Sequence, residues 1–212
     1  MNTYHKIQTV FKRDSATRYK TVVEGMYSKS AFEYLEDNEW LFTEKVDGTN
    51  IRVMFRDGKI TFGGKTDNAS IPAPLMNILN ETFLPLLPKF MDVFKGDDVC
   101  LYGEGYGAKI QKGGGNYRSD QGFVLFDVRS GDWWLRQDDL FDVATQLDLA
   151  TVPVIGSGTL SDMVQIVKGG FSSTWGNFEA EGIVAKPVVD LQFRNGSRVI
   201  TKLKCKDFRG AV

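Results

Sequence analysis

Histidine and cysteine are scarce in this sequence, with one histidine and two cysteines among 212 residues. A zinc site and a histidine-dependent catalytic triad draw on these side chains, so the composition argues against both. Cys100 and Cys205 are too few for a disulfide framework. Because there is also no run of 18 apolar residues and no apolar N-terminal stretch, we expect a cytoplasmic protein with reduced thiols and no membrane span.

The sequence also lacks a large net charge, since its formal charge is -1. It is therefore not a uniformly basic nucleic-acid binder, although local charge matters more than the sum. Two stretches, Lys109 to Arg118 and Lys202 to Arg209, are locally basic, and such runs are commonly solvated surface. The proportions of hydrophobic (42%) and charged (25%) residues are those of a soluble globular domain. The length suits one domain with a core that needs no disulfide or structural metal.

Short strands outnumber helices in the hydrophobic pattern. Alternation over residues 51–56, the turn signal Asp57-Gly58 and the return at 59–62 predict a hairpin from Trp40 to Phe62. Pro74 can open a helix that Pro85 and Pro88 should kink or end. This mixture predicts an α+β fold of largely antiparallel sheets flanked by helices. The remaining elements that we expect are helices at 138–147 and 161–168, the latter capped by Ser161 and stopped by Gly169, and strands at 99–102, 122–128, 182–185 and 197–203.

The segment Glu44-Lys45-Val46-Asp47-Gly48-Thr49-Asn50 places a lysine at a strand end, just before a glycine that allows close approach of a ligand to the backbone. Lys-x-Asp-Gly by itself is weak, because it should occur by chance in roughly one chain of this length in twenty. The alternative is a lysine and aspartate pair on a strand edge, which contributes little.

Four further segments follow in a fixed order. Each also has an ordinary structural explanation: a solvated acid, a core strand, a strand-edge acid or a solvated lysine pair. The last segment places Lys202 and Lys204 on one face of a strand, because side chains two residues apart point the same way. The four segments are Tyr102–Gly107, Gly122–Val128, Glu181–Pro187 and Thr201–Lys204.

Together these five segments resemble motifs I, III, IIIa, IV and V of the covalent nucleotidyltransferase superfamily, which comprises DNA ligases, RNA ligases and mRNA capping enzymes. The resemblance runs from about Lys45 to Phe208. It is nearest to the nick-sealing RNA ligases of the phage type, through the Thr-Asn after Asp-Gly, the segment Gly103–Gly107 and the ending Lys-x-Lys-x-x-x-Phe. The implied fold is one nucleotidyltransferase (ATP-grasp-like DNA/RNA ligase) domain over residues 1–212, with no C-terminal OB domain.

The resemblance implies a three-step reaction. Lys45 attacks the α-phosphorus of ATP and releases pyrophosphate, the AMP passes to a 5′-phosphate, and a 3′-hydroxyl then attacks that phosphate and displaces the AMP. A lysine must be neutral to attack although its free pKa is about 10.4, and nearby positive charge lowers that pKa. We expect Lys202, Lys204 and a divalent cation to supply this charge and to neutralise the phosphate in the transition state. Asp47 matches the motif I acid and would assist the transfer steps.

Other matched residues are expected to bind the cation and the nucleotide. Glu104 and Glu181 are candidate ligands of Mg²⁺ or Mn²⁺, directly or through water, and the alternative for Glu104 is a contact with the ribose. Phe126 matches an aromatic residue that stacks on adenine, and Asn50 matches an amide that orients the reacting phosphate. Because stacking tolerates any base, adenine specificity would come from backbone or polar contacts near residues 43–46, including Glu44 and Val46.

Two features leave the interpretation open. Ligases usually carry an arginine after the motif I hairpin, where Lys65 stands here, and lysine offers charge without a bidentate fork. The glycine-rich stretch Lys109–Arg118 is either a cradle for substrate phosphates or a mobile surface loop.

The expected partner is nucleic acid, either RNA or a nicked duplex with 5′-phosphate and 3′-hydroxyl ends, bound by a monomer. The short distance from Phe208 to the end of the sequence argues against a capping guanylyltransferase or a standard DNA ligase, although both remain alternatives, and leaves open a natural single-domain ligase or a truncated catalytic domain. A degenerate nucleotide-binding module is a third, non-enzymatic alternative, but all five motifs keep their reactive residues.

Overall fold

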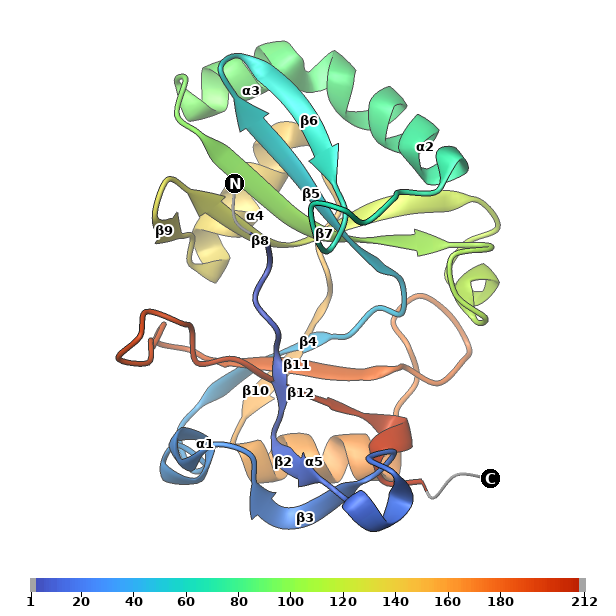
Figure 1. The fold of residues 1–212 in the computed structure, drawn as a ribbon, viewed down its shortest axis with the longest axis vertical. Coiled ribbons are helices and arrows are strands. Elements are labelled where there is room, and N and C mark those ends of the chain that lie inside the picture. The colour runs from blue at the N-terminus through green and yellow to red at the C-terminus, as the bar shows by residue number, and fades with distance from the viewer. Residues whose placement is uncertain (1–2, 210–212) are drawn as a thin grey trace. The chain divides into compact units, whose positions relative to one another are not determined.

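The computed structural model describes residues 3–209, which fold into two compact units. Unit 1 comprises residues 3–4 and 47–152, and unit 2 comprises residues 5–46 and 153–209. Each unit is built on a five-stranded sheet with helices packed against it (Figure 1). The prediction of an α+β fold with largely antiparallel sheets is confirmed.

The sheet of unit 1 is antiparallel throughout, in the order β6-β5-β7-β8-β9. At one edge of the sheet is a hairpin of β5 and β6, whose turn residues Asp57 and Gly58 both have positive φ (49° and 66°), the backbone that a tight hairpin turn requires. The hairpin predicted around this turn is confirmed, but it starts at Thr49 and not at Trp40. The strands are β5 (Thr49–Arg56), β6 (Lys59–Gly63), β7 (Val99–Gly107), β8 (Gln121–Ser130) and β9 (Trp133–Trp134).

The strand predicted at 99–102 continues through the glycine-rich segment as far as Gly107. Residues 103–107 are extended because both neighbouring strands supply partners: Thr49 pairs with Gly105, and Gly122 pairs with Tyr106. Tertiary pairing therefore overrides the low strand propensity of glycine. The consequence for the site is that Glu104 lies in the middle of a sheet.

Three helices cover one face of the unit 1 sheet and complete its apolar core. They are α2 (Ala73–Phe83), α3 (Leu87–Phe94) and α4 (Gln137–Leu147), with a 3₁₀ turn, η2 (Leu84–Leu86), between the first two. Pro85 ends α2 as predicted, whereas Pro88 lies in the first turn of α3, where proline is well tolerated. The three helices do not pack on the opposite face of the sheet, which we call the open face although its central side chains Arg52 and Tyr102 are buried.

The sheet of unit 2 has the order β1-β12-β11-β4-β10, and only the pair of β1 with β12 is parallel. The predicted strand at 182–185 is confirmed, whereas that at 197–203 is shorter and ends one residue later. The strands are β1 (Gln8–Thr9), β4 (Trp40–Glu44), β10 (Val154–Gly158), β11 (Gly182–Pro187) and β12 (Thr201–Lys204). Strand β10 was not predicted, since its Gly-Ser-Gly ending carries no strand pattern.

Helix α5 (Leu160–Gly169) packs on this sheet, together with α1 (Ser30–Tyr34) and the two-stranded sheet β2 (Phe11–Arg13) and β3 (Val22–Tyr27). Its predicted cap, Ser161, is wrong. Thr159 is the N-cap: its hydroxyl accepts from the Asp162 N–H at 3.1 Å, and its own N–H donates to the Asp162 carboxylate at 2.8 Å. The reciprocal pair identifies Thr159-x-x-Asp162 as a capping box. The short 3₁₀ turns are η1 (Ser15–Thr17), η3 (Gly114–Asn116) and η4 (Cys205–Asp207).

No helix among residues 3–209 is long and apolar enough to cross a membrane. Cys100 and Cys205 are both buried, free cysteines.

The capping box gives a stability prediction. Thr159→Ala should lower the free energy of unfolding by about 1 kcal/mol, because it leaves the Asp162 N–H without its acceptor. Ser161→Ala, on the exposed first turn, should change it by less than about 0.5 kcal/mol. Urea denaturation of the two variants measures both values. A larger loss for Ser161→Ala would contradict the assignment of the cap.

Candidate functional site

Three neighbouring strands of unit 2 bring the central candidate residues to one end of the sheet. Strand β4 ends at Glu44, just before Lys45, and pairs antiparallel with β11, which begins just after Glu181. Strand β12 ends at Lys204, which is the partner of Gly182. Lys45, Glu181 and Lys204 are far apart in the sequence, yet this strand order makes them adjacent.

The Glu181 carboxylate binds both lysines. One oxygen, Oε2, accepts from Nζ of Lys45, and the other, Oε1, forms an ion pair with Nζ of Lys204. The exposed fractions of the three side chains are 19% for Lys45, 10% for Glu181 and 20% for Lys204, so the cluster is shielded but reachable. Burial raises the pKa of Glu181, but the Lys45 and Lys204 ammonium groups outweigh this effect and hold that pKa below its ordinary value.

Backbone contacts fix the same corner of the sheet. The N–H of Lys45 donates to the Gly182 carbonyl at 2.9 Å, and the N–H of Cys205 donates to the Glu181 carbonyl at 2.9 Å. Gly182 has φ 155°, and a Cβ there would lie 2.1 Å from the Leu203 carbonyl oxygen. Only glycine fits this position, so the glycine after Glu181 is what allows β11 and β12 to meet so closely.

The predicted alternation in β12 is confirmed. Leu203 is fully buried in the core, whereas Lys202 and Lys204 are partly exposed. The strand ends at Lys204, so Lys206 does not share its alternation and lies exposed in η4. The two lysines therefore share one face of the sheet.

A buried carboxylate that the sequence did not single out supports Lys204. Asp207 is fully buried, accepts from the Lys204 N–H at 2.9 Å and forms an ion pair with Arg13 at 3.0 Å. An acid three residues beyond a strand end is a recognisable capping signal, which could have identified Asp207. Its pairing with Arg13 carries no signal, because nearly the whole sequence separates the two.

Glu44 and Val46, which flank the central lysine, are buried, with 1% and 4% exposed. The Glu44 carboxylate is held by Ser173 and Thr174 of unit 2, so its side chain points into the fold. The Val46 carbonyl accepts from Nζ of Lys45 at 3.4 Å. Contacts of these residues with a nucleotide would therefore come from the backbone.

On unit 1 the predicted residues Asn50 and Glu104 are direct cross-strand partners in β5 and β7. They lie on the open face of the sheet, because their neighbour Ile51 belongs to the helix-covered core. The Asn50 Oδ1 atom is buried and has no hydrogen-bond partner within residues 3–209. Such an atom is costly unless a ligand or water satisfies it, which is in keeping with a binding role for Asn50.

Asp47 and Gly48 lead into β5 and are held by the glycine-rich loop. The Asp47 N–H donates to the Tyr117 hydroxyl at 3.2 Å, and the Gln111 side chain donates to the Gly48 carbonyl at 2.9 Å. A Cβ on Gly48 would lie 2.2 Å from the Gly105 carbonyl oxygen, so β5 and β7 meet there only through glycine. The stretch 109–118 is thus docked on the motif I turn, a role that the sequence did not suggest.

Phe126 lies on the same open face because of a β-bulge. The pairing of β8 with β7 shifts between Asp127 and Leu125, which leaves Phe126 as the extra residue. The Tyr4 ring packs edge-on against Phe126, with centroids 5.1 Å apart, and its hydroxyl donates to Asp127 at 2.8 Å. Both residues of the bulge therefore point to the open face, and Phe126 is half-buried against Tyr4.

Lys65 is exposed on the loop that follows β6. A buried arginine lies behind this loop: Arg52, 1% exposed, donates to the Gly64 carbonyl at 2.9 Å and pairs with Asp67 at 2.7 Å. Arg52 thus holds the loop that carries Lys65.

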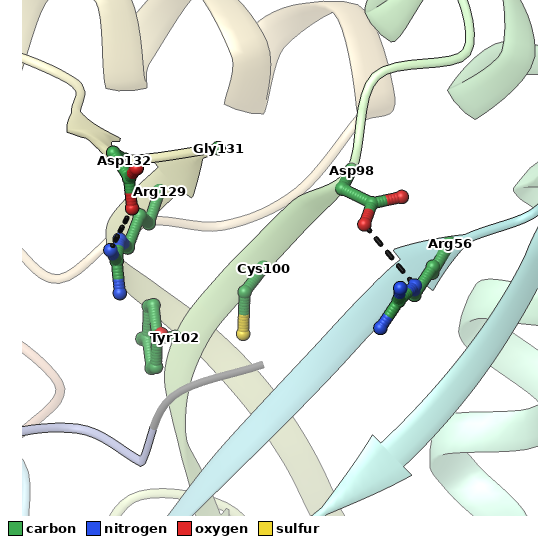
Figure 2. A pocket seen from close by; sticks show the side chains of 7 residues that line it. All are labelled: Arg56, Asp98, Cys100, Tyr102, Arg129, Gly131 and Asp132. Carbon is green, nitrogen blue, oxygen red and sulfur yellow. Dashed lines mark hydrogen bonds and ion pairs between the residues drawn. The ribbon is translucent and has the colours of Figure 1, made fainter.

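A separate pocket of about 280 Å³ opens on unit 1 and contains none of the predicted residues (Figure 2). Its two arginines are already paired, Arg56 with Asp98 at 3.2 Å and Arg129 with Asp132 at 2.7 Å. Burial raises the pKa of the Cys100 thiol in its wall to about 11, so this cysteine is not a reactive thiolate. The lysine cluster is therefore a better candidate for a catalytic site than this pocket.

The lowered pKa of Glu181 predicts a pH dependence of stability. Its folded-state pKa lies below the unfolded value of about 4.3, so it stabilises the fold above that pH and this contribution is lost as the pH falls through the folded pKa. The melting temperature of the wild type should exceed that of Glu181→Gln most near neutrality, and the difference should shrink below about pH 4.3. Glu179→Gln, which affects an exposed pair with Arg209, is the control and should change little. A constant difference across this range would contradict the assignment.

Comparison with known proteins identifies the family and the fold of this chain. The family model described as RNA ligase matches residues 38–204. Among similar solved structures are mutants of the RNA ligase of Naegleria gruberi with AMP and Mn (TM-score 0.64, 18% identity) and with ATP and Mn (TM-score 0.65, 19% identity), and the same ligase with PPi (TM-score 0.65, 20% identity). They cover 82%, 84% and 82% of this chain, which spans only about half of theirs, 52%, 54% and 52%. At these identities the structures establish the fold, and the family match over most of the sequence establishes that the chain belongs to the RNA ligase family.

Proposed function

We propose that this chain is the nucleotidyltransferase domain, made of both units, of an ATP-dependent RNA ligase. It joins 5′-phosphate and 3′-hydroxyl ends through a lysyl-AMP on Lys45 and an adenylylated 5′ end. The observation that carries the proposal is the cluster in which Glu181 binds both Lys45 and Lys204. A partly exposed lysine beside a second cation and an ionised carboxylate suits attack on a phosphate, and membership of the RNA ligase family supports this chemistry.

The cluster also defines what must change before reaction. A carboxylate beside an ammonium group favours its charged form, whereas attack on phosphorus needs the neutral amine. Glu181 must therefore exchange its contact with Lys45 when nucleotide binds. Lys204 and Lys202 then stand on the sheet face beside Lys45, where positive charge stabilises both the amine and the phosphate oxygens.

A divalent cation fits the donor set. No group of three or more His, Cys, Asp or Glu side chains within residues 3–209 could hold a metal alone. Mg²⁺ does not need such a group, because it keeps several waters and binds through one or two carboxylates and substrate phosphates. The ionised, partly exposed Glu181 is suited to this, and Glu104 is a second candidate on unit 1. The bound cation would supply positive charge at the phosphate.

The open face of unit 1 supplies the proposed nucleotide contacts. Asn50 offers a buried carbonyl oxygen without a partner within residues 3–209, and Glu104 is its neighbour across the sheet. Phe126 presents an aromatic ring on the same face for the adenine. Lys65 would contact the ribose or phosphate from its exposed loop, and Asp47 would assist transfer from the turn after Lys45.

Membership of the RNA ligase family supports RNA as the proposed partner, and a DNA ligase or a capping guanylyltransferase is the alternative. The Naegleria ligase structures with ATP, AMP, PPi and Mn favour ATP and a divalent cation. Labelling with ATP and with GTP in parallel tests the capping alternative, because a capping enzyme takes GTP. A DNA ligase is labelled by ATP as well and is distinguished by which nick it seals. We also expect a cytoplasmic monomer, in keeping with two unpaired buried cysteines.

Lys45 should be indispensable for the covalent adduct. Lys45→Ala removes the nucleophile, and Lys45→Arg keeps a side chain that stays protonated and cannot attack. Incubation with labelled ATP and Mg²⁺ should label the wild type and neither variant, and EDTA should abolish the labelling. Covalent label retained on Lys45→Ala would sink the proposal.

The C-terminal lysines should differ in role. Lys202→Ala and Lys204→Ala should each slow lysyl-AMP formation by about 10²–10³-fold, the usual loss when one group that stabilises developing charge is removed. Lys206→Ala, exposed beyond the strand, should leave this step intact and weaken nucleic-acid binding in a salt-dependent way. Single-turnover labelling and binding at several salt concentrations measure both effects. The reverse pattern would show that the assignment of motif V is shifted by two residues.

The substrate prediction concerns ends held by a duplex. Nicked or paired ends should be sealed faster than free single strands, and the strand with the 3′-hydroxyl should be RNA, because a small domain has little surface to capture two separate strands. Sealing rates on nicked RNA, nicked DNA and single strands provide the measurement. Faster sealing of nicked DNA would instead favour a DNA ligase.

A further inference from the structure

The buried carboxylate next to Lys45 has three hydrogen-bond donors. Oε1 of Glu44 accepts from the Ser173 hydroxyl at 2.6 Å. Oε2 accepts from the Thr174 N–H at 2.9 Å and from the Thr174 hydroxyl at 2.8 Å. Glu44 is only 1% exposed, and a carboxylate so far from water is tolerated only when such donors satisfy it. The three bonds therefore form a specific attachment and not an incidental contact.

This attachment ties the strand that carries Lys45 to the segment that carries Glu181. Ser173 and Thr174 lie on the connection between α5 and β11, eight and seven residues before Glu181, which immediately precedes β11. The connection is ordered by its own bonds: the Ser173 N–H donates to the Phe178 carbonyl at 2.8 Å, and the Trp175 N–H donates to the Ser173 hydroxyl at 3.1 Å. Glu44 thus anchors a compact turn.

We propose that Ser173 and Thr174 are positioning residues, which hold Lys45 in register with Glu181 by clamping the carboxylate of Glu44. The inference rests on the proposed function and assigns a role to two residues outside the nucleotidyltransferase motifs. Lys45 follows Glu44 directly, so the clamped residue is the immediate neighbour of the residue that bears the reacting amine. The Lys45 N–H also donates to the carbonyl of Gly182, the residue after Glu181. All of these contacts lie within unit 2. A displacement of about 1 Å at a reacting group can reduce rate 100-fold, so a small slip here would matter.

The clamp can be loosened without large changes in volume. Ser173→Ala removes one hydroxyl donor, and Thr174→Val removes the other while keeping the side-chain shape and the backbone N–H bond. Thr174→Ser keeps a hydroxyl and is the conservative rescue. Ser172→Ala is the matched control, because Ser172 is the exposed neighbour in the same segment.

The experiment combines single-turnover lysyl-AMP formation over a range of ATP concentrations with amide hydrogen exchange at Lys45. Ser173→Ala and Thr174→Val should lower the rate at saturating ATP at least about tenfold and change the half-saturating ATP concentration by less than about twofold, the pattern of lost positioning and not of lost binding. The Lys45 amide should exchange faster. Ser172→Ala and Thr174→Ser should behave like the wild type. Melting curves identify any variant that fails to fold, in which case Thr174→Val, the milder change, decides.

Wild-type rates in both variants, or a raised half-saturating ATP concentration at an unchanged rate, would overturn the clamp. A wild type that forms no lysyl-AMP would instead refute the proposed function. The amide exchange then still tests the clamp, because it needs no activity: unchanged exchange at Lys45 in Thr174→Val contradicts the positioning role.

Discussion

The bond of one carboxylate to two lysines is the interaction on which the site depends. Lys45 and Lys204 stand close together and are mostly shielded from water, an arrangement that repulsion between like charges would oppose without Glu181 between them. Removing that carboxylate would leave two partly buried cations without a counter-ion. The same bond also keeps Lys45 charged, so the resting site is stable but not yet reactive. Stability and reactivity therefore make opposite demands on Glu181.

The stability of the cluster comes from the order of the strands in the sheet and not from proximity of its residues in the sequence. The strand order β12-β11-β4 within one sheet brings three strand ends together. The close approach at Gly182 lets β11 and β12 meet without a side chain between them. Buried acids beyond the cluster then fix the backbone: Glu44 on one side of Lys45, and Asp207 beside Lys204. A rigid supporting shell of this kind is what a reaction limited by positioning and charge requires.

Local patterns carried most of what could be predicted. The hairpin around Asp57-Gly58 and the helix ended by Pro85 follow from a few adjacent residues. Lys45 and Glu181 were selected by the resemblance of five ordered segments to the nucleotidyltransferase motifs. The remaining features depend on contacts between residues far apart in the sequence, and these could not be predicted. Nothing in the sequence joins Arg13 to Asp207, and Thr159 was missed because Ser161 is an equally good cap by residue type. The length of β7 depends on two neighbouring strands and was invisible in a glycine-rich segment.

The motif residues of unit 1 follow the same division. The pairing of Asn50 with Glu104 depends on the register of β5 and β7, and the face on which Phe126 lies depends on a bulge, so neither could be read from residue type. The docking of Gln111 and Tyr117 on the turn after Lys45 shows that a glycine-rich basic stretch can hold backbone in place. The motif pattern thus selected the residues, and only the tertiary structure showed how they are held.

The central claim is that Lys45 is the residue to which nucleotide becomes attached. Tandem mass spectrometry of peptides from wild-type protein incubated with ATP and Mg²⁺ locates the modified side chain directly. The account predicts AMP on Lys45 and on no other lysine of the peptide map. AMP on Lys202 or Lys204, or a stable protein that carries no AMP at all, would contradict it.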